Sequence, residues 1–221
     1  MGIRIYGIFA SRAVRPLWAA QELGLAFEHV PTPYANKATR TSDFMSLNPN
    51  GHIPVLIDER EDASRPIVVW ESMACALYLA RHHGPPDGKS ITPASAEEDA
   101  QALRWSFWSV TELEADALTV LMHRFVMPEE RRKPELADAA LARLQAPLGV
   151  LDQALGRNAR GGEPVYLAGD RFTVADVCVA SVVNWLRPSQ GLEGFEHANA
   201  WLHTCLKRPA YKALKNLEAR Q

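Results

Sequence analysis

Short apolar runs alternate with amphipathic segments in the first third of the chain. In residues 2–8, GIRIYGI, Ile3 and Ile5 fall on one face, which predicts a β-strand. Residues 12–23 then carry apolar side chains at helical spacing, and Gly24 follows as a stop signal, so a helix is expected there. The chain therefore opens with a strand and a helix.

The same alternation continues over the next sixty residues or so. It predicts further strands at 26–31, 53–58 and 65–70, a short helix that ends at Leu47, and a longer helix at 71–82. The resulting order is βαβ, then α, then ββα. This is the order of a thioredoxin-like domain.

A different pattern holds after this domain. Residues 83–93, HGPPDGKSITP, are rich in Gly and Pro and have no periodicity, which predicts a linker. No strand pattern follows, and helices are expected at 95–124, 133–156, 174–187, 196–204 and 207–219. The predicted fold class is an α/β thioredoxin-like N-terminal domain at 1–83, a linker at 84–92 and an all-α C-terminal domain at 93–221.

Composition narrows the classes of function. The chain has 221 residues, a net charge of −2 at pH 7 and 47% apolar residues, which is an ordinary globular composition. Because no basic stripe stands out, nucleic acid and an anionic membrane surface are not expected partners. The N-terminus lacks the regions of a signal peptide, and the apolar run 177–185 is too short to span a bilayer.

The three cysteines are Cys75, Cys178 and Cys205, an odd number at wide spacing without a CxxC pair. A disulfide framework is therefore not expected, and a reducing cytoplasm is the expected location. His82 and His83 have no further ligands at metal-binding spacing, so no metal site is predicted.

The segment NPNGHIPVL, residues 48–56, places Pro54 at the head of a predicted strand. Proline has no N–H for a sheet, so a cis bond in a tight bend is one interpretation. Such a bond would expose the backbone of Ile53 to an extended peptide, which could bind by strand addition. An ordinary turn proline is the alternative.

Two helix starts carry further signals. In VVWESMACALYLA, residues 68–80, Glu71 and Ser72 begin a helix after a strand, where free N–H groups could bind a carboxylate and Glu71 an ammonium group. The alternative is a simple helix cap.

In AGDRFTVADVCVA, residues 168–180, Thr173 and Asp176 have capping-box spacing, and Phe172 and Val177 can form a hydrophobic staple. We interpret this third motif as structural.

Together these motifs resemble the cytosolic glutathione S-transferase family, over nearly the whole chain. In family order stand S…R at 11–15, NGHIPVL at 50–56, ES at 71–72, GDRFTVAD at 169–176 and WLHTCLKRPAYKAL at 201–214. The resemblance implies the glutathione S-transferase fold, glutathione as cosubstrate and a homodimer. It also implies transfer of the glutathione thiol to a small electrophile, which would be a detoxification reaction.

The resemblance also assigns residues. It implies that Ile53, before Pro54, pairs its backbone with the cysteinyl part of glutathione, and that Glu71 and Ser72 hold the γ-glutamyl group. By the same resemblance, His52 contacts the glycyl or cysteinyl end. A basic residue upstream, Arg40 or Lys37, would meet the glycine carboxylate.

The thiol must be activated, because only a few per cent of a free thiol with a pKa near 8.5 is thiolate at neutral pH. The family uses Tyr, Ser or Cys, and no cysteine precedes Cys75. Ser11, followed four residues later by Arg15, fits the Ser-type pattern of bacterial, theta-, phi- or nu-like members, and Tyr6 is the alternative. Ser11 would donate a hydrogen bond to the sulfur.

Pro16 does not fit a helix capped by Ser11, because its ring removes a hydrogen bond in the first turn. Either that turn is distorted or the regular helix begins later.

The electrophile would bind between the domains, and aromatic residues are the natural candidates. They are Phe9, Trp105, Trp108 and Trp185, together with His123. Core packing is the alternative for the tryptophans.

Three functions remain open on the sequence. The first is a glutathione transferase, and the second is a related glutathione-dependent isomerase, dehalogenase or peroxide and disulfide reductase. The third is a non-catalytic binding or regulatory protein of the same fold. The complete set of Ile53, Pro54, Glu71 and Ser72 favours the first two.

Overall fold

A computed structural model describes residues 2–60, 64–85, 90–159 and 165–218. These residues form two compact units, the first of Met1–Ala94 with Arg208–Gln221 and the second of Ser95–Lys207. In this division the last helix belongs to the first unit, whereas the sequence analysis placed it in the C-terminal domain at 93–221, and the first unit extends to Ala94, past the predicted linker. The chain leaves the first unit once and returns to it at its end.

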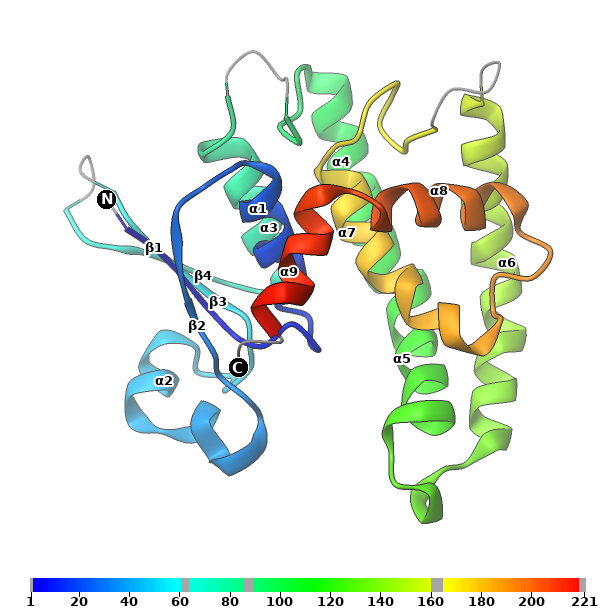
Figure 1. Ribbon diagram of the computed structural model, residues 1–221, viewed down its shortest axis with the longest axis horizontal. Helices are drawn as coiled ribbons and strands as arrows, with labels where there is room; N and C mark the ends of the chain where they lie inside the picture. Colours follow the sequence, from blue (N-terminus) through cyan, green and yellow to red (C-terminus); the bar gives the residue numbers. More distant parts are fainter. Residues whose placement is uncertain (1, 61–63, 86–89, 160–164, 219–221) are drawn as a thin grey trace. The chain divides into compact units, whose positions relative to one another are not determined.

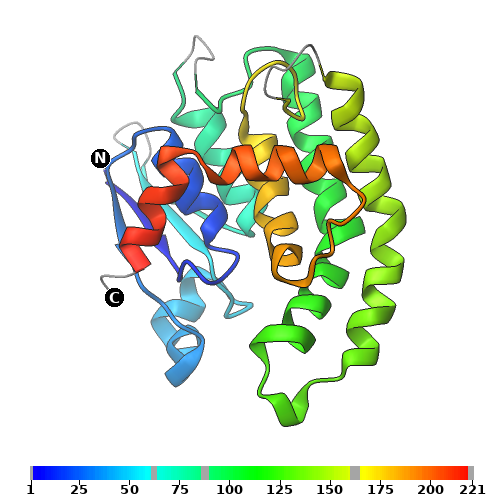
Figure 2. The ribbon, with the colours of Figure 1, turned by 45° about the vertical axis from the view of Figure 1, so that its right-hand side comes forward.

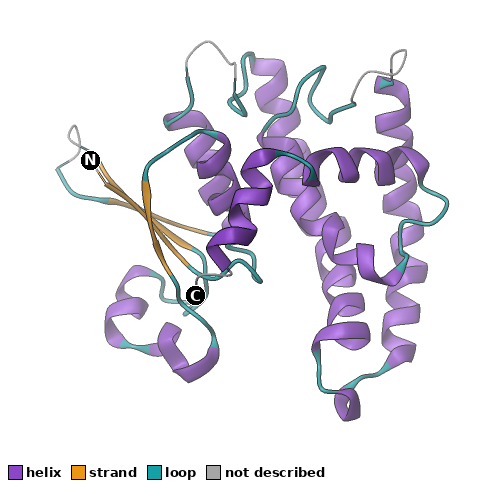
Figure 3. Cartoon of the chain, in the orientation of Figure 1, coloured by secondary structure: helices purple, strands orange, loops and turns teal. Residues whose placement is uncertain are grey.

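The first unit is built around a four-stranded sheet (Figures 1 and 3). Its strands are β1 (Gly2–Tyr6), β2 (Phe27–Val30), β3 (Val55–Glu59) and β4 (Ile67–Trp70), in the order β2-β1-β3-β4. β1 runs parallel to β2 and antiparallel to β3, and β3 is antiparallel to β4. This mixed sheet confirms the predicted strand order.

Helices cover both faces of this sheet. They are α1 (Val14–Glu22), α2 (Ser42–Leu47) and α3 (Ser72–His82), with a 3₁₀ segment η1 (Ala35–Arg40) before α2. A further helix of this unit, α9 (Pro209–Glu218), packs against α1. Ile5 and Leu56 are opposite each other and fully buried, toward α1 and α3. Tyr6, on the opposite face of β1, packs with Phe44 of α2. The period-two alternation of β1 therefore separates the two faces.

The second unit is helical in the residues that the structure describes (Figure 2). It contains α4 (Ala96–Trp108), α5 (Ala115–Leu121), α6 (Pro134–Asn158), α7 (Val174–Val183) and α8 (Glu196–Leu206). Shorter helical segments are η2 (Ser109–Glu114), η3 (Met122–Val126), η4 (Glu129–Arg131) and η5 (Asn184–Ser189). Every residue of α7 is buried, so α7 forms the core of this unit and packs against α4 and α8.

The start of α7 contains the predicted capping box. Thr173 N donates to Asp176 Oδ2 at 2.9 Å, and Asp176 Oδ1 accepts from Leu167 N at 3.0 Å and from Trp201 Nε1 at 2.9 Å. Burial raises the pKa of Asp176 from 3.8 to about 6, although these donors oppose the shift. The carboxylate thus connects α7, α8 and the segment before α7, which is a structural role.

Two further observations concern the cysteines and the length of the helices. Cys75, Cys178 and Cys205 are buried, and none of the three forms a disulfide in the described part of the chain. None of the helices in the described part of the chain is long and apolar enough to cross a membrane.

Candidate functional site

Ser11 lies in the loop between β1 and α1, before the regular helix. Its Oγ donates to the carbonyl of Ile8 at 2.6 Å and accepts from the N–H of Ala13 at 3.1 Å. The α-helix begins at Val14, and Ala13 is the N-cap residue. Pro16 therefore falls in the first turn, where its missing N–H has no intrahelical acceptor to lose. Of the two possibilities that Pro16 left open, the later start of the helix is the one observed, and Ser11 is not the N-cap.

Gly7 allows this loop to pass close to the helix. It has a φ of 141°, and a Cβ at this position would lie 2.4 Å from Ala13 Cβ. The loop is held from β2 as well, because Gly7 N donates to Val30 O at 3.1 Å and His29 Nε2 lies 2.8 Å from Gly7 O. A side chain at Gly7 would displace the segment that carries Ser11.

Arg15 connects α1 with the start of α3. It is 1% exposed, and its Nη1 donates to Ser72 Oγ at 2.7 Å. Because Ser72 accepts this bond, its own O–H is available to donate to another group. Glu71 precedes it with a φ of 70° and an exposed side chain. This left-handed backbone at a non-glycine residue is uncommon and typical of constrained sites.

The turn before β3 is held by its asparagines. Asn48 accepts from Asn50 N at 3.0 Å and donates to His52 O at 2.8 Å. Arg40 Nη1 donates to Asn50 O at 3.2 Å, which ties η1 to this turn. His52 is exposed, and Ile53 after it is 3% exposed.

The Ile53–Pro54 bond is cis, one of the two interpretations of the proline motif. Ile53 also lies outside the register of β3, which begins two residues later.

Two residues near this site, Tyr34 and Arg12, were not singled out by the sequence analysis. Tyr34 follows β2, and its hydroxyl interacts with the backbone of Ile53 and with the Arg12 charge. Burial raises the pKa of the Tyr34 phenol, and both interactions oppose the rise. The positions of Tyr34 and Arg12 depend on the path of two loops, which residue patterns do not predict. The one hint in the sequence was that Arg12 directly follows Ser11.

The alternative activating groups have other surroundings. Tyr6 lies under α2, with its ring centroid 6.3 Å from that of Phe44 in an edge arrangement. Cys75 is fully buried, and burial together with the Glu71 charge raises the pKa of its thiol. A buried thiol of raised pKa is a poor nucleophile. Among these groups, Ser11 is the one in a loop at the start of a helix.

The aromatic candidates divide between the units. In the first unit, Phe9 contacts Tyr211, with ring centroids 5.9 Å apart. In the second unit, Trp105 is 5% exposed and packs edge-on against Trp108 at 5.0 Å. His123 Nδ1 accepts from Lys133 N at 3.2 Å.

Trp185 is half-buried in η5. Among the described residues, no group of His, Cys, Asp or Glu could hold a metal ion.

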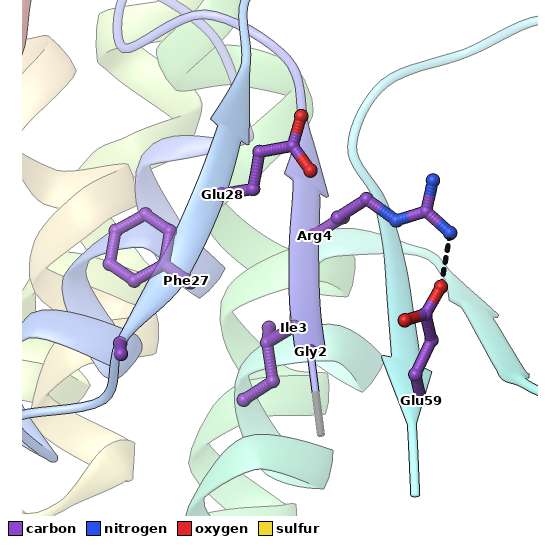
Figure 4. A pocket seen from close by; sticks show the side chains of 7 residues that line it. Gly2, Ile3, Arg4, Phe27, Glu28 and Glu59 are labelled. Carbon is purple, nitrogen blue, oxygen red and sulfur yellow. Dashed lines mark hydrogen bonds and ion pairs between the residues drawn. The ribbon is translucent and has the colours of Figure 1, made fainter.

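A shallow depression lies on the outer part of the sheet and is separate from these residues (Figure 4). Its charged side chains come from three strands: Arg4, Glu28 and Glu59. Arg4 donates to Glu59 at 2.6 Å, so the one cation among its lining side chains is already paired. We assign no ligand to this surface.

Family models match both parts of the chain. The glutathione S-transferase N-terminal domain matches residues 1–81, and the glutathione S-transferase C-terminal domain matches residues 114–209. The chain belongs to the glutathione S-transferase family. The resemblance found in the sequence is confirmed, and so is the fold class.

Individual relatives agree with this assignment. Glutathione S-transferase GstB of Escherichia coli (strain K12) is 28% identical over 198 residues, covering 89% of this chain and 88% of that protein. Glutathione S-transferase 3 of Zea mays is 29% identical over 220 residues, covering 95% and 91%. Elongation factor 1-gamma of Homo sapiens is 27% identical over 212 residues, covering 92% of this chain but 44% of that protein.

Solved structures share the fold over almost the whole chain. Glutathione transferase F7 from Populus trichocarpa has a TM-score of 0.82 at 23% identity, covering 98% of this chain and 99% of that one. A glutathione transferase from Pseudomonas putida with glutathione disulfide bound has a TM-score of 0.79 at 24% identity, covering 96% and 90%.

Proposed function

We propose that this protein is a Ser-type glutathione transferase that activates the thiol of glutathione for attack on small electrophiles. The observation that carries the proposal is the position of Ser11, whose hydroxyl lies at the start of α1 in the unit that also presents Ile53, Glu71 and Ser72. Family membership supports a glutathione-dependent function, and the bound glutathione disulfide of the Pseudomonas putida structure supports the ligand.

Glutathione would bind along the first unit through its backbone and its charged ends. The backbone of Ile53 would pair with the cysteinyl residue by strand addition. The γ-glutamyl carboxylate would meet the N-terminus of α3, where Ser72 has a free O–H to donate, and Glu71 would meet the ammonium group. His52 and Arg40 would reach the glycyl end.

Activation would require a change of hydrogen bond at Ser11. In this structure its proton is donated to the Ile8 carbonyl, so the hydroxyl must rotate toward the sulfur when the thiolate forms. The Ala13 N–H can continue to donate to Oγ, which makes the hydroxyl a better donor. Each unit by which the thiol pKa falls corresponds to about 1.4 kcal/mol of preference for the charged form.

The remaining parts of the proposal follow the family resemblance. Phe9, Trp108 and His123 would contact the electrophile, and buried Trp105 would support the Trp108 ring through their edge-on contact. We expect a homodimer in the cytoplasm that acts in detoxification. Sedimentation at micromolar concentration would test the dimer, because a monomer has a mass of 24.5 kDa.

The elongation factor 1-gamma relative favours a second candidate function. That protein is named as an elongation factor and not as a transferase, although it is 27% identical to this chain over 212 residues. A binding role without turnover is therefore the alternative, together with the related glutathione chemistries. The alternatives differ in whether bound glutathione becomes a thiolate.

The experiment is glutathione binding by calorimetry, paired with the ultraviolet absorbance of the thiolate during a pH titration. We expect binding, and a thiolate signal at neutral pH. Ser11→Ala should abolish that signal, lower kcat/KM toward a model electrophile by about 10–100-fold and leave most of the binding, because one charged hydrogen bond is lost.

Ser46→Ala is a matched control, since Ser46 Oγ also donates to the carbonyl three residues earlier, at 2.6 Å. It should change neither quantity. No binding at millimolar glutathione would refute the enzyme, and binding without thiolate would favour the binding role. If Tyr6→Phe and not Ser11→Ala removes the thiolate, Tyr6 is the activating residue.

A further inference from the structure

The backbone of Ile53 is the part of the proposed site to which an extended peptide would add. Ile53 precedes the cis bond to Pro54 and lies outside the paired register of β3, which begins at Val55. The strands on either side of β3 therefore do not pair with its N–H. Because Ile53 is only 3% exposed, leaving that N–H without an acceptor in the free protein would be costly.

The phenol oxygen of Tyr34 supplies that acceptor. The hydrogen bond between Tyr34 and the backbone of Ile53 opposes the rise in the pKa of the phenol that burial causes. A hydrogen bond has this effect when it is donated to the phenol oxygen, so the backbone group is the N–H of Ile53. A side chain of the protein thus already makes one of the hydrogen bonds that an extended ligand would make.

The segment that carries Tyr34 is fixed to the same turn at its other end. Tyr34 directly precedes η1, and Arg40, the last residue of η1, donates from Nη1 to Asn50 O at 3.2 Å. A Cβ at Gly51 would lie 2.5 Å from the same Nη1, so the guanidinium packs directly on the turn. The segment therefore contacts the turn at both ends, which keeps the Tyr34 hydroxyl beside the Ile53 N–H.

Tyr34 can leave this position at a small cost in free energy. It is 50% exposed, and water replaces a hydrogen bond of this kind when it breaks, so the net contribution of the bond is modest. The charge of Arg12, the residue after Ser11, also acts on the phenol. The hydroxyl therefore lies near the Ile53 turn and the Ser11 loop, the two segments that the cysteinyl residue of glutathione would contact.

We propose that the Tyr34 hydroxyl is an internal competitor of glutathione: it occupies the Ile53 N–H in the free protein, and the cysteinyl carbonyl of glutathione displaces it. This inference rests on the proposed function, because it requires that glutathione adds to the backbone of Ile53. Only the molecules in which Tyr34 has moved away can bind, so the contact lowers the apparent affinity by that fraction. One hydrogen bond of this kind corresponds to a factor of about 3–10 in the dissociation constant.

Tyr34→Phe tests the competition, because it removes the phenol oxygen and keeps the ring. In calorimetry the variant should bind glutathione about 3–10-fold more tightly than the parent. Tyr166→Phe is the matched control, since it removes a phenol hydroxyl from the second unit, outside the proposed glutathione site, and should leave the affinity unchanged. Because Tyr34 is half-exposed, Tyr34→Phe should fold, and its urea-unfolding midpoint should be close to that of the parent.

A second measurement examines the contact without any ligand. Hydrogen exchange of the Ile53 amide can be followed in protein labelled with ¹⁵N-isoleucine, with Ile53→Val to assign the signal. The Ile53 amide should exchange about 3–10-fold faster in Tyr34→Phe than in the parent, because it has lost its acceptor. The amide of Ile57, which is paired within β3, is the internal reference and should exchange at the same rate in both proteins.

The outcomes distinguish a failure of this inference from a failure of the proposed function. If neither the parent nor Tyr34→Phe binds glutathione, the proposed function is wrong, and the competition with it. If both bind with equal affinity, Tyr34 does not compete, and if Tyr34→Phe binds more weakly, the hydroxyl contacts the ligand instead; either result overturns this inference alone. An Ile53 exchange rate that Tyr34→Phe leaves unchanged would show that Tyr34 does not occupy the N–H in solution.

Discussion

At the scale of single residues, the buried contact between Arg15 and Ser72 connects the two helix starts of the proposed glutathione site. Arg15 is almost fully buried, and its guanidinium donates to the hydroxyl of Ser72, a residue that is itself only 4% exposed. From the sequence, two roles were open for Arg15: a source of positive potential or a partner in a structural ion pair. The contact gives Arg15 a specific role: it occupies one lone pair of Ser72 Oγ and so orients the Ser72 hydroxyl.

This contact predicts that Arg15 and Ser72 are coupled in glutathione binding. Arg15→Met and Ser72→Ala should each weaken binding by about 5–20-fold, since each removes a hydrogen bond or the orientation of one. The double variant should bind glutathione no more weakly than the weaker-binding single variant. This corresponds to a coupling energy between the two residues of roughly 1 kcal/mol. Calorimetry on the four proteins measures it, and fully additive losses would show that the two residues act independently.

The sequence singled out residues of the proposed site but not their contacts. Ser11, Ile53, Glu71 and Ser72 were singled out because a serine after a strand, a proline at a strand head and a helix start each leave a local pattern. The bond from Ser11 to Ile8, the contact of Arg15 with Ser72 and the position of Tyr34 depend on how loops pass one another. No periodicity encodes that.

At the scale of elements, the helices were predictable because their apolar faces repeat with the helical period. The predicted helix at 95–124 is the clearest departure, since the structure divides it into α4, the π-helical η2, α5 and the π-helical η3. A wide turn shifts the apolar face by a fraction of a turn, which the sequence pattern does not resolve. The capping box at the start of α7 could be predicted from the sequence because it is a local motif.

The raised pKa of Asp176 predicts an unusual pH dependence of stability. The unfolded carboxyl ionises near 3.8 and the folded one near 6, so in that range the folded state retains a proton that the unfolded state has lost. The contribution of Asp176 is therefore fully present below pH 3.8 and is lost as the pH rises through about 6. From pH 4.5 to 7.5 it should lower the free energy of unfolding by about 2 kcal/mol.

Urea unfolding at these two pH values, with Asp176→Asn as the comparison, measures this contribution. Asp176→Asn should be less stable at both pH values by about 2–4 kcal/mol, because an amide nitrogen replaces one acceptor oxygen. Its free energy of unfolding should, however, lack the part of the pH dependence that Asp176 contributes. Asp152→Asn is a control, since Asp152 also accepts from a helix start, at Ala198 N. A slope that is identical in the parent and Asp176→Asn would contradict the shifted pKa.

At the scale of the whole molecule, the chain returns to its first unit through the last helix. α9 packs against α1, with the rings of Trp18 and Tyr211 4.6 Å apart. The sequence placed this helix in the second domain because it follows a series of helices without a break. Sequence order cannot reveal such a return, because the apolar face of α9 would suit either unit.

The ion pair at this closure predicts how strongly α9 stabilises the first unit. Arg208 donates two hydrogen bonds of 2.7 Å to Glu22, whose side chain is only 6% exposed and also accepts from Trp18. Arg208→Leu should lower the free energy of unfolding by about 1–3 kcal/mol, because it leaves a mostly buried carboxylate without its cation.

Arg4→Leu is the matched control, since the side chains of Arg4 and Glu59 are 34% and 48% exposed, and it should cost at most about 1 kcal/mol. Urea unfolding compares the two variants. Equal losses would show that α9 is held by its apolar face and not by this ion pair. A larger loss for Arg208→Leu would show that the bidentate pair fixes the end of the chain to the helix that follows Ser11.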